Sequence, residues 1–357
     1  MSKKPLILGI ESSCDETAAS LITENEEGFP VVLSNIVSSQ VEVHREFGGV
    51  VPELAARSHI EKIDWIVKKA IDESGRKIEE IDAVASTAGP GLIVCLSVGL
   101  SFGKAFATAM NKPFIAVNHL EGHALSPKLN TNLNYPYLLL LISGGHSQYL
   151  SVQNLGKYKR LGTTIDDALG EAFDKTAKLL GIEFPGGPQI EILAKKGDPE
   201  KYDLPKPIFS KGGCNLSFAG LKTAVLKISK TIKSEQDKYD LAASFQKTIE
   251  EILYKKTKIA FTEFEKINEL KEKIFVVAGG VAANKKIRSM LINLCEENNY
   301  KSIFPPIEFC GDNAAMIAMV GLEKFKINQF DDLDYPAKPR WPLDEDAAFL
   351  KGAGVQL

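Results

Sequence analysis

Two of the five histidines in this 357-residue sequence, His119 and His123, stand four positions apart in the motif NHLEGHA. That spacing places both imidazoles on one face of a helix. The apolar run 114–117 precedes the motif, Asn118 is a good helix cap and Pro127 would end the helix, so we expect the pair near a helix N-terminus at the carboxyl end of a strand. On spacing alone, a metal site and a solvated helix face are roughly even alternatives.

A third metal ligand is available in the segment CGDNAA, which puts Asp312 at a sharp turn before the apolar stretch 314–320. An aspartate in such a position more commonly caps the helix that follows. Two imidazoles and one carboxylate with open coordination positions suit a Lewis-acid metal, and this set accepts iron, zinc or manganese. The sequence therefore predicts one divalent metal, with iron(II) favoured and zinc as the alternative, held by His119, His123 and Asp312.

A metallopeptidase is the main rival interpretation of the histidine pair. In peptidases with the motif His-Glu-x-x-His, the glutamate follows the first histidine directly and stays close to the metal-bound water. Here Glu121 comes two residues after His119. At 100° per residue it lies about 200° around the helix and points away from the metal face. The helix geometry therefore argues against peptidase chemistry.

Glycine-rich segments occur in both halves of the chain, at 143–146 (SGGH), 185–188 (PGGP) and 279–284 (GGVAAN). Glycines allow backbone amides to approach a phosphate or a nucleoside closely. Each segment alone is more often a plain turn. Their occurrence in both halves indicates a nucleotide site.

Other charged residues and histidines have an ordinary structural explanation as well as a functional one. The predicted helix 164–180 carries Asp167 and Asp174 on one face with Glu171 between them, and such carboxylates are most often solvated. A basic run is either a solvated helix face or a contact with RNA phosphates, and it contains Lys222, Lys227, Lys230 and Lys233. The other histidines, His44, His59 and His146, are interpreted as packing or hydrogen-bonding residues.

Strands and helices that alternate along the chain must position these residues. The segments 6–17, 138–148 and 274–284 are apolar runs that stop at small or polar residues, as buried strands do before a tight turn. An alternating stretch follows the first two, at 18–23 and 149–152, so a strand, turn and strand occur once in each half. Helical periodicity predicts helices at 54–74, 98–110, 164–180, 241–264 and 283–298. The pattern predicts an α/β fold with a weak internal repeat, and the polar segment 130–136 is the expected lobe boundary.

Composition narrows the class of protein. Lysine plus arginine (43) nearly balance aspartate plus glutamate (46), so the net charge of −3 gives no bulk attraction to nucleic acid. The five cysteines are scattered and never form Cys-x-x-Cys, which argues against disulfides and a thiolate zinc site and favours a reducing cytoplasm. No apolar run approaches the ~20 residues of a membrane helix, and the run 6–10 is too short for a signal peptide.

Nine motifs, spread over nearly the whole chain, together resemble one family closely. They are GIESSCDET (9–17), GGVVPE (48–53), GPGL (89–92), NHLEGH (118–123), SGGH (143–146), AFDK (172–175), PGGP (185–188), SFAGLK (217–222) and DNAAMI (312–317). In this order they resemble the tRNA N6-adenosine threonylcarbamoyltransferase family in its bacterial TsaD form. The resemblance implies a two-lobed, actin-like and sugar-kinase-like α/β fold with a duplicated mixed-sheet core. It places residues 1–131 in an N-terminal lobe, onto which roughly 326–357 pack back, and residues 132–325 in a C-terminal lobe.

The activity implied by the resemblance is transfer of a threonylcarbamoyl group from threonylcarbamoyl-AMP to adenosine 37 of tRNAs that read codons beginning with A. The implied partners are tRNA, a TsaB-like inactive homologue, a TsaE-like ATPase and a TsaC-like adenylate synthase. The implied metal ligands are again His119, His123 and Asp312, in the cleft of the two-lobed enzyme. The implied residues of the substrate-nucleotide site are Leu141, Ile142, Ser143, Gly144, Gly145, Asp174, Gly187 and Asn284.

The sequence departs from the family pattern at a few positions. Val94 and Cys95 stand where the family has glycine and a small residue, Ser97 replaces a leucine, and Gly311 replaces a threonine beside Asp312.

In the mechanism that we expect, the metal orients the donor while the exocyclic amine of adenine attacks and AMP leaves. Glu11, in the first hairpin turn, is the candidate for handling a proton. The rival functions are a metallopeptidase and a non-catalytic nucleotide-binding scaffold.

Overall fold

The computed structural model describes residues 4–348, and the chain divides into two compact units. Unit 1 contains the described residues up to Leu133 together with Pro305–Glu345, and unit 2 contains Asn134–Phe304 with the few described residues from Asp346. The first crossing thus falls within the polar segment 130–136. The chain returns to unit 1 at Pro305, about twenty residues before the predicted position near 326. Of the tail 326–357 that was expected to pack on the first lobe, 349–357 lie outside the described residues.

Unit 1 is built on a five-stranded sheet in the order β3-β2-β1-β4-β5. Strand β1 pairs antiparallel with β2 and parallel with β4. The first three strands therefore form an antiparallel meander, and the sheet continues through β4 and β5 as a parallel half. The strands are β1 (Ile7–Glu11), β2 (Glu16–Glu24), β3 (Pro30–Ser39), β4 (Ala83–Gly89) and β5 (Phe114–Asn118). The helices are α1 (Val41–His44), α2 (Pro52–Ser74), α3 (Ile93–Ala109), α4 (His119–Leu125) and α10 (Ala314–Lys326).

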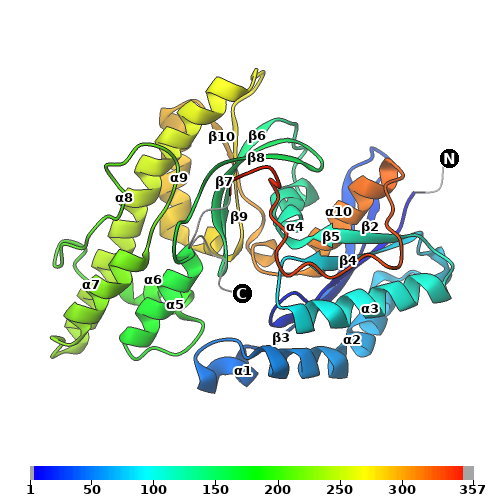
Figure 1. Ribbon diagram of the computed structural model, residues 1–357, viewed down its shortest axis with the longest axis horizontal. Helices are drawn as coiled ribbons and strands as arrows, with labels where there is room; N and C mark the ends of the chain where they lie inside the picture. The colour runs from blue at the N-terminus through cyan, green and yellow to red at the C-terminus, as the bar shows by residue number, and fades with distance from the viewer. Residues whose placement is uncertain (1–3, 349–357) are drawn as a thin grey trace. The chain divides into compact units, whose positions relative to one another are not determined.

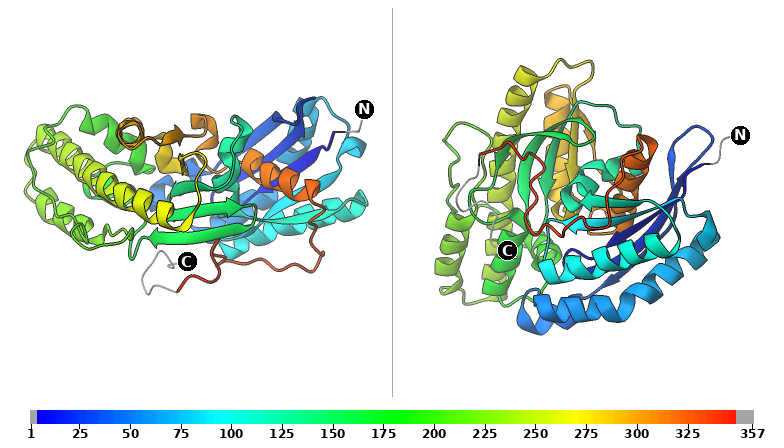
Figure 2. Two further views of the ribbon diagram at one scale, coloured as in Figure 1. Left: turned by 90° about the horizontal axis from the view of Figure 1, so that it is seen from above. Right: turned by 45° about the vertical axis from the view of Figure 1, so that its right-hand side comes forward.

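Helices cover both faces of the unit 1 sheet. Leu8 and Ile10 of β1 face a hydrophobic core that includes Ile66 of α2 and Leu100 of α3. Helices α2 and α3 lie side by side in each view of the molecule (Figure 1, Figure 2). On the opposite face α10 packs against β1 so closely that a Cβ at Gly9 would lie 2.5 Å from the Ala314 carbonyl oxygen. This packing explains why α10 belongs to unit 1, because the sheet would otherwise expose one apolar face.

Unit 2 repeats the same arrangement of strands, in the order β10-β9-β6-β7-β8. An antiparallel hairpin, β6-β7, again continues into parallel pairing through β6 and β9. The repeat inferred from the two hairpin patterns is therefore confirmed. The strands are β6 (Tyr137–Ile142), β7 (Ser147–Asn154), β8 (Lys157–Thr163), β9 (Ile274–Ala278) and β10 (Lys301–Ile303). The helices are α5 (Leu169–Leu179), α6 (Gly186–Ala194), α7 (Ala219–Ser229), α8 (Glu235–Ile267) and α9 (Lys285–Glu297).

Helix α5 begins later than the sequence predicted, at Leu169 instead of residue 164. The Thr164 hydroxyl donates to the backbone oxygen of Asp167 at 2.6 Å, and this local turn competes with helix formation. The Asp166 carboxylate accepts the backbone N–H of Phe218 at 2.7 Å, so it caps the start of α7 instead. Asp167 therefore lies before the helix, and the predicted face shared with Asp174 does not form.

The remaining elements are short. Short 3-10 turns connect the main elements, at Arg45–Phe47, Ile78–Glu80, Ser126–Leu129, Gly280–Ala283 and Ile307–Phe309. No disulfide joins the five cysteines, all of which lie within residues 4–348. Within residues 4–348, no helix combines the length and the apolar character that crossing a membrane requires.

Candidate metal centre and nucleotide pocket

The histidine pair lies on α4, which begins directly after β5. The Asn118 side chain accepts the backbone N–H of Leu120 at 2.9 Å and caps the helix, as predicted. The His119 and His123 rings lie 4.8 Å apart between centroids at an angle of 87°, and both side chains are buried. The predicted helix and its shared histidine face are therefore confirmed.

Asp312 is not the cap of α10, because its neighbour takes that role. The Asn313 side chain accepts the backbone N–H of Met316 at 3.1 Å, and Asn35 of β3 accepts that of Ala315 at 3.2 Å. The Asp312 carboxylate instead faces α4, with Oδ1 3.1 Å from His123 Nε2 and 3.5 Å from His119 Nε2. No atom lies within 4 Å of a Cβ built at Gly311, so a threonine side chain would fit there beside Asp312 without a clash.

These three side chains fit a divalent metal ion. One atom from each of His119, His123 and Asp312 can be chosen so that all lie within 4.8 Å of one another. Ligand atoms held about 2.1 Å from a zinc-like ion lie roughly 3–3.5 Å apart, which matches the two distances to Asp312. The Asp312 side chain remains 23% exposed, so the centre is open on that side. Nitrogen and oxygen donors with an open side are typical of catalytic metals.

A second layer of contacts orients His119. Its Nδ1 lies 3.0 Å from Glu11 Oε2 and 3.2 Å from Ser13 Oγ. A metal bound at Nε2 would leave the ring proton on Nδ1, whose N–H would donate a hydrogen bond to Glu11. Glu11 is fully buried, and its oxygens also accept the Ser13 backbone N–H at 2.5 Å and the Thr87 hydroxyl at 2.6 Å. Both Glu11 oxygens are thus engaged, which favours an orienting role over proton transfer.

Carboxylates give the surroundings of His119 a strongly negative potential. Burial lowers the pKa of His119, but the charges of Asp312 and Glu11 outweigh burial and raise the pKa well above its usual range. Burial raises the pKa of Asp312, yet the imidazoles of His119 and His123 hold that pKa well below its usual range. The site therefore favours a positive charge among its ligands, and a divalent metal supplies one.

Glu121 points away from this centre, as its helix position predicted. The side chain is buried and lies 3.5 Å from Lys324 Nζ on α10. Lys324 also donates to the Ala116 carbonyl oxygen at 3.1 Å. Glu121 thus joins the helix that carries both histidines to the helix that follows Asp312, and it is not placed to act on metal-bound water.

A pocket of about 380 Å³ lies in unit 2. Four of the predicted substrate residues line it: Gly144, Asp174, Gly187 and Asn284. Others predicted with them do not line it, because Leu141 and Ile142 are buried within β6 and Gly145 is exposed outside the pocket lining. Ser143 supports the turn instead, since its backbone oxygen accepts the Gly170 N–H at 3.1 Å. The predicted glycine-rich segments 185–188 and 279–284 also contribute Pro185, Pro188, Gly280, Val281 and Ala283, whereas sequence reasoning missed Gly170, Phe173 and Glu191.

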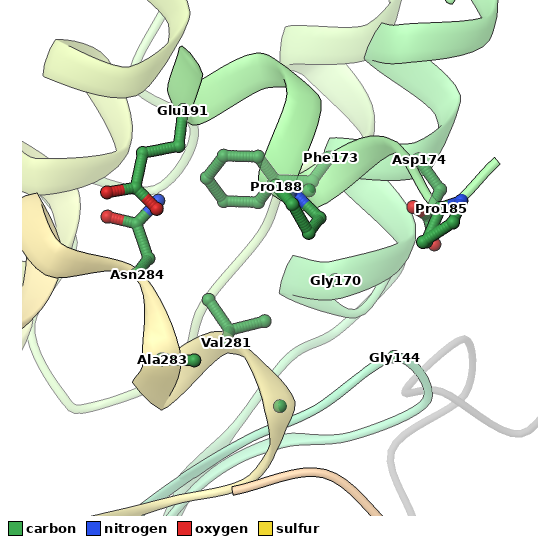
Figure 3. A pocket seen from close by; sticks show the side chains of 12 residues that line it. Gly144, Gly170, Phe173, Asp174, Pro185, Pro188, Glu191, Val281, Ala283 and Asn284 are labelled. Carbon is green, nitrogen blue, oxygen red and sulfur yellow. The ribbon is translucent and has the colours of Figure 1, made fainter. Parts of the chain in front are cut away.

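The pocket combines apolar walls with carboxylates and an amide. Figure 3 shows Phe173 and Pro188 in the middle, with Glu191 and Asn284 on one side and Asp174 on the other. Asn284 caps α9 by accepting the Lys286 and Ile287 N–H groups, each at 3.1 Å. The missed residue Glu191 follows the PGGP motif on α6, so its signal was the helix that continues from that motif.

Several charged residues outside the two sites have an ordinary structural role. Lys175 lies 2.8 Å from Asp167 and 2.7 Å from Glu171, so these carboxylates form an ion-pair cluster. The basic run is exposed on α7 and the segment after it, which leaves the choice between solvent and RNA phosphates open. It contains Lys222, Lys227, Lys230 and Lys233.

Comparison with known proteins shows the family of this chain. The family model described as tRNA N6-adenosine threonylcarbamoyltransferase matches residues 31–319. A protein with that name from Pelagibacter ubique (strain HTCC1062) is 80% identical over 357 residues, which is 100% of each chain. One from Rickettsia conorii (strain ATCC VR-613 / Malish 7) is 54% identical and covers 95% of this chain and 98% of its own.

Solved structures with little sequence similarity share the fold. HypF from T. kodakarensis superposes with a TM-score of 0.61 at 13% identity, covering 94% of this chain and 50% of its own. Component A of (R)-2-hydroxyglutaryl-CoA dehydratase from Acidaminococcus fermentans gives 0.50 at 14% identity, covering 90% and 98%. With its duplicated mixed sheets, the chain has the actin-like, sugar-kinase-like α/β fold. The resemblance drawn from nine motifs is confirmed, and the chain belongs to the tRNA N6-adenosine threonylcarbamoyltransferase family.

Proposed function

We propose that this enzyme transfers a threonylcarbamoyl group from threonylcarbamoyl-AMP to the exocyclic amine of adenosine 37 in tRNAs that read codons beginning with A. The observation that carries the proposal is the convergence of the His119, His123 and Asp312 side chains within 4.8 Å in a member of this transferase family. The amine nitrogen forms a bond to the carbamoyl carbon while the bond from that carbon to the phosphate oxygen of AMP breaks. One proton leaves the nitrogen, and AMP departs with the bonding electrons.

The chain contributes a preorganised metal centre to this reaction. A divalent metal, for which we propose iron(II) with zinc as the alternative, would supply Lewis acidity that orients the donor and stabilises negative charge on its carbonyl oxygen. His119 and His123 present Nε2 atoms from a capped, buried helix, and Asp312 supplies the carboxylate from the turn before α10. Because AMP is already a good leaving group, positioning and electrostatics carry most of the catalysis.

We assign the adenosine part of the donor to the unit 2 pocket. Its volume of about 380 Å³ lies within the range typical of small-molecule sites. Phe173, Pro188 and Val281 provide apolar surface for a base, and Asp174 and Glu191 provide oxygens that can accept hydrogen bonds from ribose hydroxyls or the adenine amine. The exposed backbone around Gly144 can approach a phosphate without steric hindrance, since no atoms lie within 4 Å of a Cβ built there.

Glu11 has two proposed roles that one pair of variants separates. As an orienting residue it needs only to accept the hydrogen bond from His119 Nδ1, which lies 3.0 Å away. As the proton acceptor it needs its charge. Glu11→Gln keeps an acceptor oxygen, so it should retain much of the metal affinity that Glu11→Ala loses. Loss of transfer in Glu11→Gln with normal metal affinity would support proton transfer, and a wild-type transfer rate in Glu11→Ala would exclude both roles.

A reconstituted reaction tests the proposed function against its rivals. The protein is incubated with a TsaB-like homologue, a TsaE-like ATPase, a TsaC-like adenylate synthase, threonine, bicarbonate, ATP and unmodified tRNA. Digested tRNA is then analysed by mass spectrometry for threonylcarbamoyladenosine at position 37. We expect product with the wild-type chain and none with His119→Ala. Product with both would favour a non-catalytic scaffold, and no product with verified metal and partners would contradict the proposal.

A further inference from the structure

We propose that His59 and Gln40, which touch neither a metal ligand nor the nucleotide pocket, are positioning residues for the metal centre. They hold the turn 12–15 between β1 and β2, which supplies the contacts to His119. The inference rests on the proposed metal centre and adds a layer of residues beyond Glu11 and Ser13. All of these residues belong to unit 1.

Three segments hold the turn: the start of α3, helix α2 and the residue Gln40. The Ser12 hydroxyl donates to the Cys95 carbonyl oxygen of α3 at 2.9 Å, and the Ser13 carbonyl accepts the Leu92 N–H at 2.8 Å. The next two carbonyl groups of the turn, those of Cys14 and Asp15, contact residues between 40 and 59 instead. His59 Nε2 lies 3.0 Å from the Cys14 oxygen, and the Gln40 backbone N–H donates to the Asp15 oxygen at 3.0 Å.

The acceptor at Cys14 determines the tautomer of His59. A carbonyl oxygen can only accept, so His59 Nε2 carries the proton. Nδ1 is then an acceptor in the neutral ring, and it lies 2.7 Å from the Thr17 hydroxyl and 3.3 Å from Gln40 Nε2. Both of those groups can donate to it. His59 is fully buried, which favours the neutral form that this pattern requires.

The hydrogen bonds continue from His59 through the side chains of Gln40 and His44. Gln40 Oε1 lies 3.3 Å from His44 Nε2, so His44 donates from that nitrogen. Its Nδ1 accepts the Val51 backbone N–H at 3.3 Å. The side chains of Thr17, Gln40, His44 and His59 are all buried. Replacing His59 by an apolar side chain removes the hydrogen bond to the Cys14 carbonyl oxygen, while Gln40 Nε2 keeps the Thr17 hydroxyl and the Ala55 oxygen as other acceptors.

The chain of hydrogen bonds reaches the metal centre through the turn. Ser13 is the residue next to Cys14, and its hydroxyl lies 3.2 Å from His119 Nδ1. Its backbone N–H donates to Glu11 Oε1 at 2.5 Å, and the other oxygen of Glu11 faces the same His119 nitrogen. A shift of the Cys14 carbonyl therefore moves the two groups that orient His119. His59 acts through the turn, not on the ligand itself.

Zinc affinity tests this inference without reference to transfer activity. Zn²⁺ is titrated into the full-length, metal-free protein in competition with a chromogenic chelator, and stability is measured in parallel by urea unfolding. His59→Phe fills the same space but cannot donate to Cys14, and His59→Gln restores an N–H near the position of Nε2. By analogy with outer-shell residues, we expect His59→Phe to bind Zn²⁺ about 10-fold more weakly, with most of the affinity restored in His59→Gln.

Two reference variants complete the design. Ser20→Ala removes another buried hydroxyl from β2, one that donates to the Ser34 oxygen at 2.6 Å, and it should keep wild-type Zn²⁺ affinity. His119→Ala reports the metal centre itself. Affinity in His59→Phe equal to that of the wild type would overturn the inference while leaving the metal centre intact. Wild-type binding that does not depend on His119 would overturn the metal centre and this inference together.

A measurement on the wild-type chain covers the case in which His59→Phe does not fold. In protein labelled with ¹⁵N-histidine, the ring nitrogen shifts of His59 and His44 report their tautomers directly. We expect both rings to carry a proton on Nε2, and we expect the His59 ring to be neutral at pH 7. A proton on Nδ1 of His59, or a charged His59 ring at that pH, would contradict the hydrogen-bond pattern on which the inference depends.

Discussion

At the scale of single residues, the place of the histidine pair was predictable and that of its carboxylate partner was ambiguous. The four-residue spacing of His119 and His123 is a local signal, and the structure shows the helix that it predicted. Asp312 and Asn313 are both good helix caps, so the sequence could not tell which one caps α10. The structure decides this, because Asn313 accepts the N–H of Met316 and leaves Asp312 to face the histidines.

Removal of the ligand charge gives the first prediction. In Asp312→Asn the shape is kept and the negative charge is lost, so the two imidazoles lose the carboxylate that faces them at 3.1 and 3.5 Å. We expect Zn²⁺ affinity to fall by about 100-fold, at the upper end of the effects seen even for outer-shell changes. Asp167→Asn is the matched control, since that carboxylate pairs with Lys175 in unit 2. Equal Zn²⁺ affinity in the two variants would remove Asp312 from the ligand set.

His59 was interpreted from the sequence as a packing or hydrogen-bonding residue, and the structure agrees. Its partner Cys14 lies 45 positions away, so no local pattern could reveal what it holds. Burial lowers the pKa of His59, with Lys62 acting in the same direction, while the Cys14 carbonyl and the charges of Glu11 and Asp15 act against it.

A pH dependence follows from that lowered pKa. Unfolded histidine has a pKa of about 6.5, so near and below this pH the unfolded chain binds more protons at this site than the folded chain. The stability of the metal-free wild type should therefore fall relative to His59→Gln as the pH is lowered from 7 to 5. Urea unfolding at pH 7, 6 and 5 measures the difference, in which the other histidines cancel. A constant difference over this range would contradict the neutral, buried His59.

At the scale of elements, strands and helices with strong periodicity were found close to their predicted limits. The helix predicted at 54–74 is α2, Pro52–Ser74, and the apolar runs became β1, β6 and β9. The start of α5 was wrong because Asp166 and Thr164 make side-chain contacts that the periodicity does not contain. The return of α10 to unit 1 was also missed, since it depends on a close approach at Gly9 rather than on local sequence.

The contact between α4 and α10 gives a prediction about stability. Glu121 and Lys324 form a buried pair whose side chains are 5% and 8% exposed. Removing one partner leaves a buried charge alone, and such changes cost about 3–5 kcal/mol of unfolding free energy. Urea unfolding should show this loss in Glu121→Ala. The double variant Glu121→Leu with Lys324→Met should recover most of it, because apolar replacement of both partners is often neutral. Additive losses in the double variant would show that the pair is not coupled.

At the scale of the whole molecule, the duplicated sheet was visible in the sequence as two hairpin patterns. The metal ligands all belong to unit 1 and the pocket lining to unit 2. The glycine segments marked three parts of the pocket wall. Gly170, Phe173 and Glu191 were not predicted, because they are ordinary helix residues that only tertiary packing brings around one space.

Separate sites predict separable binding. His119→Ala should bind AMP with wild-type affinity, since no pocket residue lies in unit 1. Glu191→Ala should bind AMP about 10-fold more weakly, as expected for loss of one hydrogen bond to a charged group. Isothermal titration calorimetry with AMP measures both, and Zn²⁺ affinity of Glu191→Ala serves as the reciprocal control. Weakened AMP binding in His119→Ala to the same degree as in Glu191→Ala would contradict the assignment of AMP to the pocket.

The most direct test of the account supplies the donor itself. Threonylcarbamoyl-AMP and unmodified tRNA are mixed with the metal-loaded chain and its TsaB-like and TsaE-like partners, and threonylcarbamoyladenosine and AMP are quantified by mass spectrometry over time. The account predicts equal amounts of both products with the wild type and a rate at least about 100-fold lower with His119→Ala, the size of one catalytic electrostatic contribution. Transfer by His119→Ala at the wild-type rate would contradict the central claim that the metal centre on α4 performs this reaction.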